Sequence, residues 1–254
     1  MKYSMIAVLL IGIFSGGLSK ADPYLAEGPY SPDKYTALLL HFDEAAGESL
    51  PQDSSLYGND AISGPLATGN PGVFGNAMSF ANQFAGFPNT VPYAMVQTNG
   101  FVEFWMKPDT NTIDHWDNEN IMQKNDGGSN PGDFTIGFSM APISIYGGGS
   151  FRLLIEDGSG YRTWQTPKQI TAVRWYHVVV AWDSVNPPTI SVDGVPQILS
   201  VSGTGTNNYF GPIFTAGNLL GLGVSDGVAG SSILIDELRI GTPPPPAGTI
   251  IVIK

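Results

Sequence analysis

Residues 101–108 read Phe-Val-Glu-Phe-Trp-Met-Lys-Pro, and this stretch decides the fold class. Successive side chains of a β-strand point to opposite faces, so Val102, Phe104 and Met106 share one face. The other face carries Glu103 between two aromatic side chains. A strand that is apolar on both faces suits the centre of a sheet, and Glu103 then needs a polar partner if it is buried.

Short apolar or alternating runs of the same kind recur through residues 35–242, separated by Gly, Pro, Asn and Asp. No stretch keeps a helical period for three turns, and no repeat of fixed length is visible. With Gly 32, Pro 20 and only 13% charged residues, the composition also favours many strands joined by turns. Besides Phe101–Lys107, the predicted strands are Thr36–Phe42, Asp133–Met140, Phe151–Glu156, Tyr176–Trp182, Thr189–Val192, Asn218–Val224 and Ile233–Ile240.

Three later segments resemble a known family when they are taken in order. Residues 175–183 (WYHVVVAWD) look like its W-x-H-V-A strand, residues 190–194 (ISVDG) like its V-D-G hairpin, and residues 235–240 (IDELRI) like its closing strand. The family is the laminin-G-like and pentraxin-like group of the concanavalin A-like lectin/glucanase jelly rolls. Further similar segments are residues 38–43, 53–59, 75–80, 101–108, 121–124 and 133–138.

The resemblance covers about residues 36–242 and implies an all-β fold. The implied class is a two-sheet antiparallel β-sandwich, a concanavalin A-like jelly roll, with its first and last strands adjacent. The dipeptide Asp193-Gly194 supports the family's hairpin independently, because Gly tolerates the positive φ of a tight turn.

The N-terminal residues predict export. Met5–Phe14 is an apolar run behind a positive start, and Ser19-Lys20-Ala21 supplies the small residues of a signal-peptidase site. The chain has no cysteine and no Asn-x-Ser/Thr acceptor, which favours a bacterial protein that is extracellular or periplasmic. The predicted parts are a signal peptide at 1–21, a linker at 22–34, a laminin-G-like domain at 35–242 and a Pro-rich tail at 243–254.

The charge balance limits the partners. A formal net charge of −11 repels phosphate backbones and anionic lipid, so we expect neither nucleic acid nor direct membrane insertion. A polysaccharide or a glycoprotein surface is the expected partner.

The sequence predicts no catalytic residue. Glycoside hydrolysis usually needs two facing carboxylates, and Glu103 has no second Glu two or four residues further along its strand. Asp236 and Glu237 are consecutive, so strand alternation predicts that they point to opposite faces. His177 lies in an apolar strand, where a hydrogen-bonded core histidine is expected. A divergent glycan hydrolase or lyase stays an alternative.

Two oxygen-rich stretches, Asp53–Asp60 and Asp109–Asp133, are compatible with calcium, which prefers oxygen ligands. The resemblance implies that such acidic residues bind Ca²⁺ in many relatives, and it puts Asp53, Asn59 and Asp236 forward as ligands of a structural ion. The same residue types also make turns without any metal.

Sugar binding would use exposed aromatic side chains that stack on a pyranose ring. The candidates are Trp116, Tyr161, Trp164 and Tyr209, all in stretches expected to be loops; a lid over the core is the alternative for each. The predicted function is a secreted, non-catalytic carbohydrate-binding or adhesion module. A structural subunit of an extracellular layer, attached through the tail, is the second prediction. For Thr249–Lys254 (TIIVIK) the alternatives are an added edge strand, a docking tail, the start of a further domain and a frayed terminus.

Overall fold

The computed structural model describes residues 28–80, 83–88, 95–108, 117–124, 134–140, 149–157, 159–167, 170, 173–208, 220–223 and 233–243. The structural statements that follow concern these ranges. The predicted signal peptide and the tail from residue 244 onward lie outside them.

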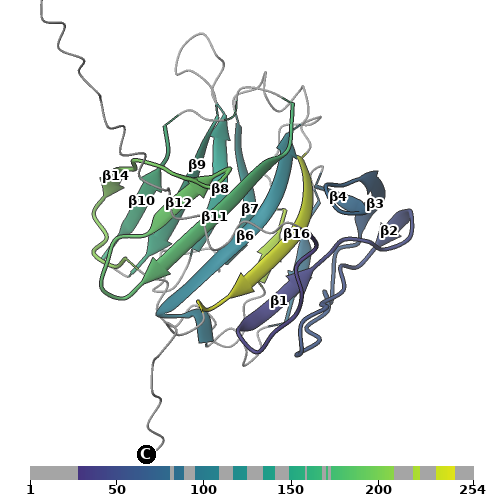
Figure 1. Ribbon diagram of the computed structural model, residues 1–254. Coiled ribbons are helices and arrows are strands. Elements are labelled where there is room, and N and C mark those ends of the chain that lie inside the picture. The colour runs from purple at the N-terminus through teal and green to yellow at the C-terminus, as the bar shows by residue number, and fades with distance from the viewer. Residues whose placement is uncertain are drawn as a thin grey trace, which may run out of the picture.

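Two antiparallel β-sheets pack face to face (Figure 1), which confirms the predicted all-β sandwich. Sheet A has nine strands, ordered β13-β12-β11-β6-β16-β4-β3-β2, with β1 also paired to β16. Its strands are β1 (Thr36–Leu40), β2 (Gly47–Ser49), β3 (Leu66–Pro71), β4 (Asn76–Phe80), β6 (Asn99–Pro108), β11 (Tyr176–Asp183), β12 (Thr189–Val192), β13 (Val195–Pro196) and β16 (Ile233–Gly241).

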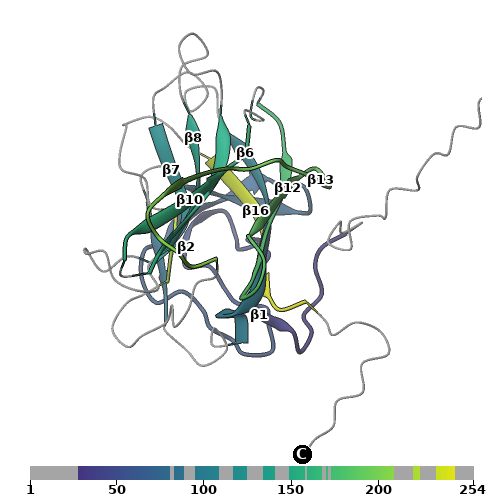
Figure 2. The same ribbon diagram turned by 90° about the vertical axis from the view of Figure 1, so that its left-hand side faces the viewer.

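Sheet B has seven strands in the order β14-β10-β9-β8-β7-β15-β5. Figure 2 shows the sandwich from the side at which strands β10, β12 and β13 lie. The strands of sheet B are β5 (Ala85–Phe87), β7 (Asp117–Lys124), β8 (Phe134–Met140), β9 (Ser150–Glu156), β10 (Tyr161–Gln165), β14 (Ser200–Gly203) and β15 (Leu220–Leu222).

The core lies between the sheets and follows the predicted alternation. Val102, Phe104 and Met106 of β6 are all buried in it, as are Leu153 of β9 and Trp164 of β10. Each fully buried large apolar side chain stabilises the fold by roughly 1.5–3 kcal/mol relative to exposure. Burial of one face from each sheet therefore explains why the periodicity of two appears so clearly in the strongest strands.

Strand β16 is the structural centre of sheet A. One of its edges pairs with β6, and the other pairs first with β4 and then with β1. The first and last strands of the domain are therefore adjacent, as the resemblance implied. Along the β6 edge the register shifts between Asp236 and Arg239, and Glu237 has a φ of 49°. A bulge of this kind re-aims the side chains beside it.

The hairpin predicted at Asp193-Gly194 is present between β12 and β13. Both residues have positive φ, 51° and 75°. Asp193 also accepts a hydrogen bond from the backbone N–H of His177, and its carboxylate pairs with Arg174. The turn is therefore held from the neighbouring strand as well as by its own backbone.

The described part of the predicted linker, residues 28–34, packs against the domain. Tyr30 is buried, with 5% of its surface exposed. The partners of Tyr30 lie on β11 and β16, far away in sequence, so this residue of the predicted linker anchors the segment to the sandwich.

Candidate functional site

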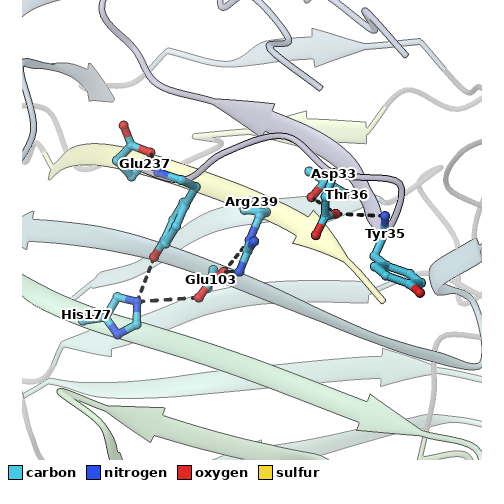
Figure 3. Close-up of polar contacts among 8 residues, drawn as sticks. Asp33, Tyr35, Thr36, Glu103, His177, Glu237 and Arg239 are labelled. Carbon is cyan, nitrogen blue, oxygen red and sulfur yellow. Dashed lines mark hydrogen bonds and ion pairs between the residues drawn. The ribbon is translucent and has the colours of Figure 1, made fainter. Parts of the chain in front are cut away.

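A polar cluster occupies the outer face of sheet A, the face turned away from the core. Its centre is Glu103 of β6, which is fully buried. Arg239 of β16 donates to its carboxylate through Nε and Nη2. Nε2 of His177 lies 3.8 Å from the other carboxylate oxygen of Glu103 (Figure 3). Arg239 thus neutralises the buried carboxylate, and His177 lies beside it on the other neighbouring strand.

The N-terminal segment covers this cluster through Tyr30. The Tyr30 hydroxyl lies 2.9 Å from Nε2 of His177, and the guanidinium of Arg239 lies 4.8 Å from the centre of the Tyr30 ring. Burial, together with the charge of Glu103, raises the pKa of the Tyr30 hydroxyl above its ordinary value, so the phenol keeps its proton. The predicted hydrogen-bonded role of His177 is confirmed.

Glu237 holds the same segment by its backbone. Its Oε2 accepts from the N–H of Tyr30 at 2.9 Å, and its Oε1 pairs with Nδ1 of His41 at 2.8 Å. This hydrogen bond to Glu237 raises the pKa of His41. Asp236 and Glu237 therefore both serve the outer face, and the alternation argument that separated them is wrong because the bulge at Glu237 breaks it.

Asp236 fixes the turn between β3 and β4. Its Oδ2 accepts from the backbone N–H groups of Val73 and Phe74, at 2.6 and 2.9 Å. Phe74 in turn packs edge-on against Trp105. Asp236 is fully buried, and this burial raises its pKa to about 7, with a smaller contribution from the charge of Glu237.

A polar pocket of about 430 Å³ opens beside this network, after β1. His41 is fixed in its wall by Glu237. Two carboxylates of the wall already accept backbone hydrogen bonds, from Gln52 to Glu44 and from Asn76 to Asp43. The polar residues that line the pocket are His41, Asp43, Glu44, Ser49, Gln52 and Ser54.

The outer face of sheet B presents an aromatic side chain among polar ones. On β10, Trp164 points into the core, so Tyr161, Thr163 and Gln165 share the outer face. Tyr161 is 52% exposed. Directly opposite these three on β9 lie Glu156, Leu154 and Arg152.

The sequence profile described as the concanavalin A-like lectin/glucanases superfamily matches residues 88–242, more than half of the chain. The chain belongs to this superfamily. The resemblance inferred from the order of its segments is confirmed. A search of curated protein sequences found no match.

Solved structures agree with this jelly roll. The receptor-binding domain of botulinum neurotoxin type G superposes with a TM-score of 0.56 at 12% identity, over 82% of this chain and 47% of that one. The binding domain of botulinum neurotoxin DC, in complex with rat synaptotagmin II, superposes with a TM-score of 0.57 at 11% identity. The match covers 83% of this chain and 49% of that one. A third structure superposes with a TM-score of 0.55 at 10% identity, over 82% of this chain and 47% of that one. Its title says that cell entry of botulinum neurotoxin type C depends on interaction with two ganglioside molecules.

At these identities the likeness shows the fold alone. This jelly roll spans about half the length of the toxin chains it matches. No helix in the described ranges is long and apolar enough to cross a membrane.

The aromatic residues that the sequence suggests for sugar binding lie in different environments. Tyr161 is on the surface, at the start of β10 rather than in a loop. The prediction that Trp164 is an exposed sugar-binding residue is wrong. Trp164 lies inside β10 and is only 1% exposed, because alternation along that strand turns it into the core. Trp116 and Tyr209 lie outside the described residues.

The three predicted calcium ligands do not form one set. Asp53 accepts four hydrogen bonds, from the backbone N–H groups of Leu39, Ser55 and Asn59 and from the Ser55 hydroxyl. Its carboxylate is therefore used up in holding the 53–59 turn together. Asp236 binds the turn after β3 instead. Within the described ranges, no three His, Cys, Asp or Glu side chains gather as a metal site.

We expect Arg239→Met to destabilise the domain by about 3–5 kcal/mol, because it leaves the buried Glu103 carboxylate without its cation. Adding Glu103→Gln should recover part of that loss, so the double variant is less destabilised than the sum of the single changes. Urea unfolding of the four proteins measures this coupling. Strictly additive changes would show that the pair does not interact.

The raised pKa of Asp236 predicts an unusual pH dependence. The folded protein holds a proton that the unfolded carboxyl releases near its ordinary pKa of 3.8, so the free energy of unfolding falls as pH rises from about 4 to about 7. Asp236→Asn should flatten this slope and be more stable than wild type at pH 8. Asp183→Asn, at the end of β11, serves as the matched control and should keep the slope between pH 4 and 7, because the pKa of Asp183 is lowered rather than raised. An unchanged slope in Asp236→Asn would contradict the assignment.

Proposed function

We propose that this protein is a secreted, non-catalytic module that binds carbohydrate through the outer face of sheet B. The observation that carries the proposal is the position of Tyr161. Its half-exposed ring stands on a rigid strand, in the same face as Thr163 and Gln165. An aromatic ring packs on the apolar face of a pyranose, while neighbouring polar groups bond its hydroxyls.

The polar groups beside Tyr161 suit such a ligand. Glu156 stands directly opposite Tyr161 on β9, and Arg152 stands opposite Gln165 further along the same face, so polar side chains of two strands share this face with the ring. Sites carried by strands are held more precisely than sites carried by loops. The neighbouring solved structures support a binding role, since their titles describe receptor-binding domains and a dependence on gangliosides.

The burial of Glu103 on the outer face of sheet A argues against a hydrolase. Glu103, which the sequence suggested as the one face-lining carboxylate, is fully buried, paired with Arg239 and covered by the segment that carries Tyr30. A general acid or nucleophile has to reach the glycosidic oxygen or carbon of its substrate. A buried and neutralised Glu103 does not meet that requirement.

Secretion is part of the proposal and rests on the apolar N-terminal run with its small-residue cleavage site. The expected partner is an extracellular polysaccharide or glycoprotein. The acidic balance of the chain favours a ligand that is neutral or basic over one that is anionic.

The test is a glycan array probed with wild type and Tyr161→Ala, followed by calorimetry on the best ligand. Tyr161→Ala should weaken binding by about 2 kcal/mol, the usual cost of losing an aromatic anchor. Tyr57→Ala removes a tyrosine of similar exposure elsewhere, 43%, and should bind as wild type does. Loss of binding in Gln52→Ala but not in Tyr161→Ala would move the ligand to the pocket beside His41. Release of reducing sugar by wild type would overturn the non-catalytic reading.

A structural calcium ion stays a separate proposal, supported by the oxygen-rich residues 53–60 and 109–133. An ion that binds only the folded state raises the melting temperature of metal-stripped protein. Because Asp53 holds its turn by four hydrogen bonds, we expect Asp53→Ala to lower the melting temperature equally with calcium and with chelator. A calcium response in wild type that disappears in Asp53→Ala would place the ion at this turn.

A further inference from the structure

One side of the sandwich is left apolar and uncovered by the described residues. There the terminal strand of sheet A, β13, continues into the terminal strand of sheet B, β14, through only three residues (Figures 1 and 2). Val195, Ile198 and Val201 follow one another at intervals of three along this crossing. They are 60%, 88% and 50% exposed. We call these three residues the apolar seam.

Two members of the seam are exposed although they point toward the core. Val195 stands opposite Val192, and Val201 stands opposite Trp164. Directly opposed residues of an antiparallel pair share a face, and Val192 and Trp164 are both buried. Val195 and Val201 therefore lie at the open rim of the hydrophobic core, and Ile198 lies between them in the crossing, next to Leu199, which packs against the core.

Among the described residues, the edge strand β14 lacks the protection found at the other sheet ends β13, β2 and β5. β13 contains Pro196, β2 contains the charged Glu48, and β5 is covered by a bridge from Ser63 to Gly86. Strand β14 reads Ser-Val-Ser-Gly, and residues 195–208 contain no charged side chain. An exposed edge without charge, proline or cover is a template for an additional strand.

We propose that the Thr249–Lys254 segment of a second copy of this chain adds as a strand to the outer edge of β14. This segment reads TIIVIK and is rich in β-branched residues, which favour the extended conformation. In a strand, Ile251 and Ile253 share one face. That face covers the seam, while the backbone pairs with the open edge of β14 as in strand addition between proteins.

The reach of the tail favours a second copy over the chain's own edge. Gly241, at the end of β16, lies in one cross-strand row with Phe101, Ala181 and Thr189. Four strand spacings of about 4.8 Å separate β16 from β13, and sheet B lies a further ~10 Å away. The spacer Thr242–Gly248, with its four prolines, spans roughly 22 Å when it is extended. To reach β14 of its own chain, the spacer would have to be fully extended and point straight at that strand. Docking on β14 of another copy does not require the spacer to cross this distance.

The charge distribution agrees with this contact. Two copies with a net charge of −11 repel each other over most of their surface. Electrostatic repulsion between two copies is therefore weakest where the uncharged stretch 195–208 forms the contact. Lys254 adds a positive charge to the incoming segment. Since each copy carries both a tail and an open edge, the contact is head-to-tail and can extend into chains.

Sedimentation velocity of the full chain over a concentration series tests association. Wild type should form dimers and longer species as concentration rises. Val201→Lys on the edge and Ile251→Asp on the tail should each weaken association at least about tenfold. Val173→Lys, the same change at a valine that is 45% exposed elsewhere, and Ile251→Val should associate as wild type does.

Melting curves establish that Val201→Lys is folded. Ile251→Asp lies outside the described domain, so it tests the contact independently of folding. Monomers at every concentration, or association that neither Val201→Lys nor Ile251→Asp weakens, would overturn the proposal.

Cross-linking identifies the two surfaces, because the natural chain has no cysteine. Ser202→Cys and Val252→Cys are prepared as separate proteins, mixed and treated with a short bis-maleimide. A heterodimer band in the mixture, stronger than any band from either protein alone, is the expected result. A chain with both cysteines that cross-links only at monomer mass would show docking on its own edge and overturn the contact between copies.

Discussion

A carboxylate buried at the centre of sheet A is the constraint on which much of the structure depends. Glu103 has no access to water, and an isolated buried charge costs several kcal/mol. Arg239 supplies the neutralising charge only because β16 is bulged, which places it directly opposite Glu103 in the β6 register. The same bulge aims Glu237 at the backbone of Tyr30. The ion pair, the register of the central strands and the docking of the N-terminal segment are therefore one arrangement.

This arrangement also divides the two outer faces by use. The outer face of sheet A is closed by Tyr30 and by Phe74, so its polar groups serve the fold. The outer face of sheet B keeps Tyr161 and its polar neighbours at the surface. The outer face of sheet A thus has a stabilising role, and Glu103, Asp236 and Glu237 all take part in it.

The sequence alone predicts the sandwich, and its eight predicted strands are all present among the sixteen of the described ranges, because burial of one or both faces imprints a period of two. It does not predict the bulge in β16, since alternation assumes a regular ladder. The sequence predicts a loop at Trp164 because glycines precede it, and only the pairing of β10 with β9 shows the inward face of this side chain. The sequence does not predict the role of Tyr30, because its partner His177 lies 147 residues away and no local pattern indicates so distant a contact.

The position of β16 has a consequence for synthesis. The strand that joins β6 to both β1 and β4 is the last one of the domain, so sheet A stays in three pieces, β13-β12-β11-β6, β4-β3-β2 and the unpaired β1, until residue 241 has left the ribosome. Until then the nascent chain carries unpaired strand edges on these pieces, and such edges are prone to wrong association. Pairing between residues so distant in sequence is also slow. Chaperones that bind the growing chain therefore have to protect these unpaired edges until almost the entire domain has been translated.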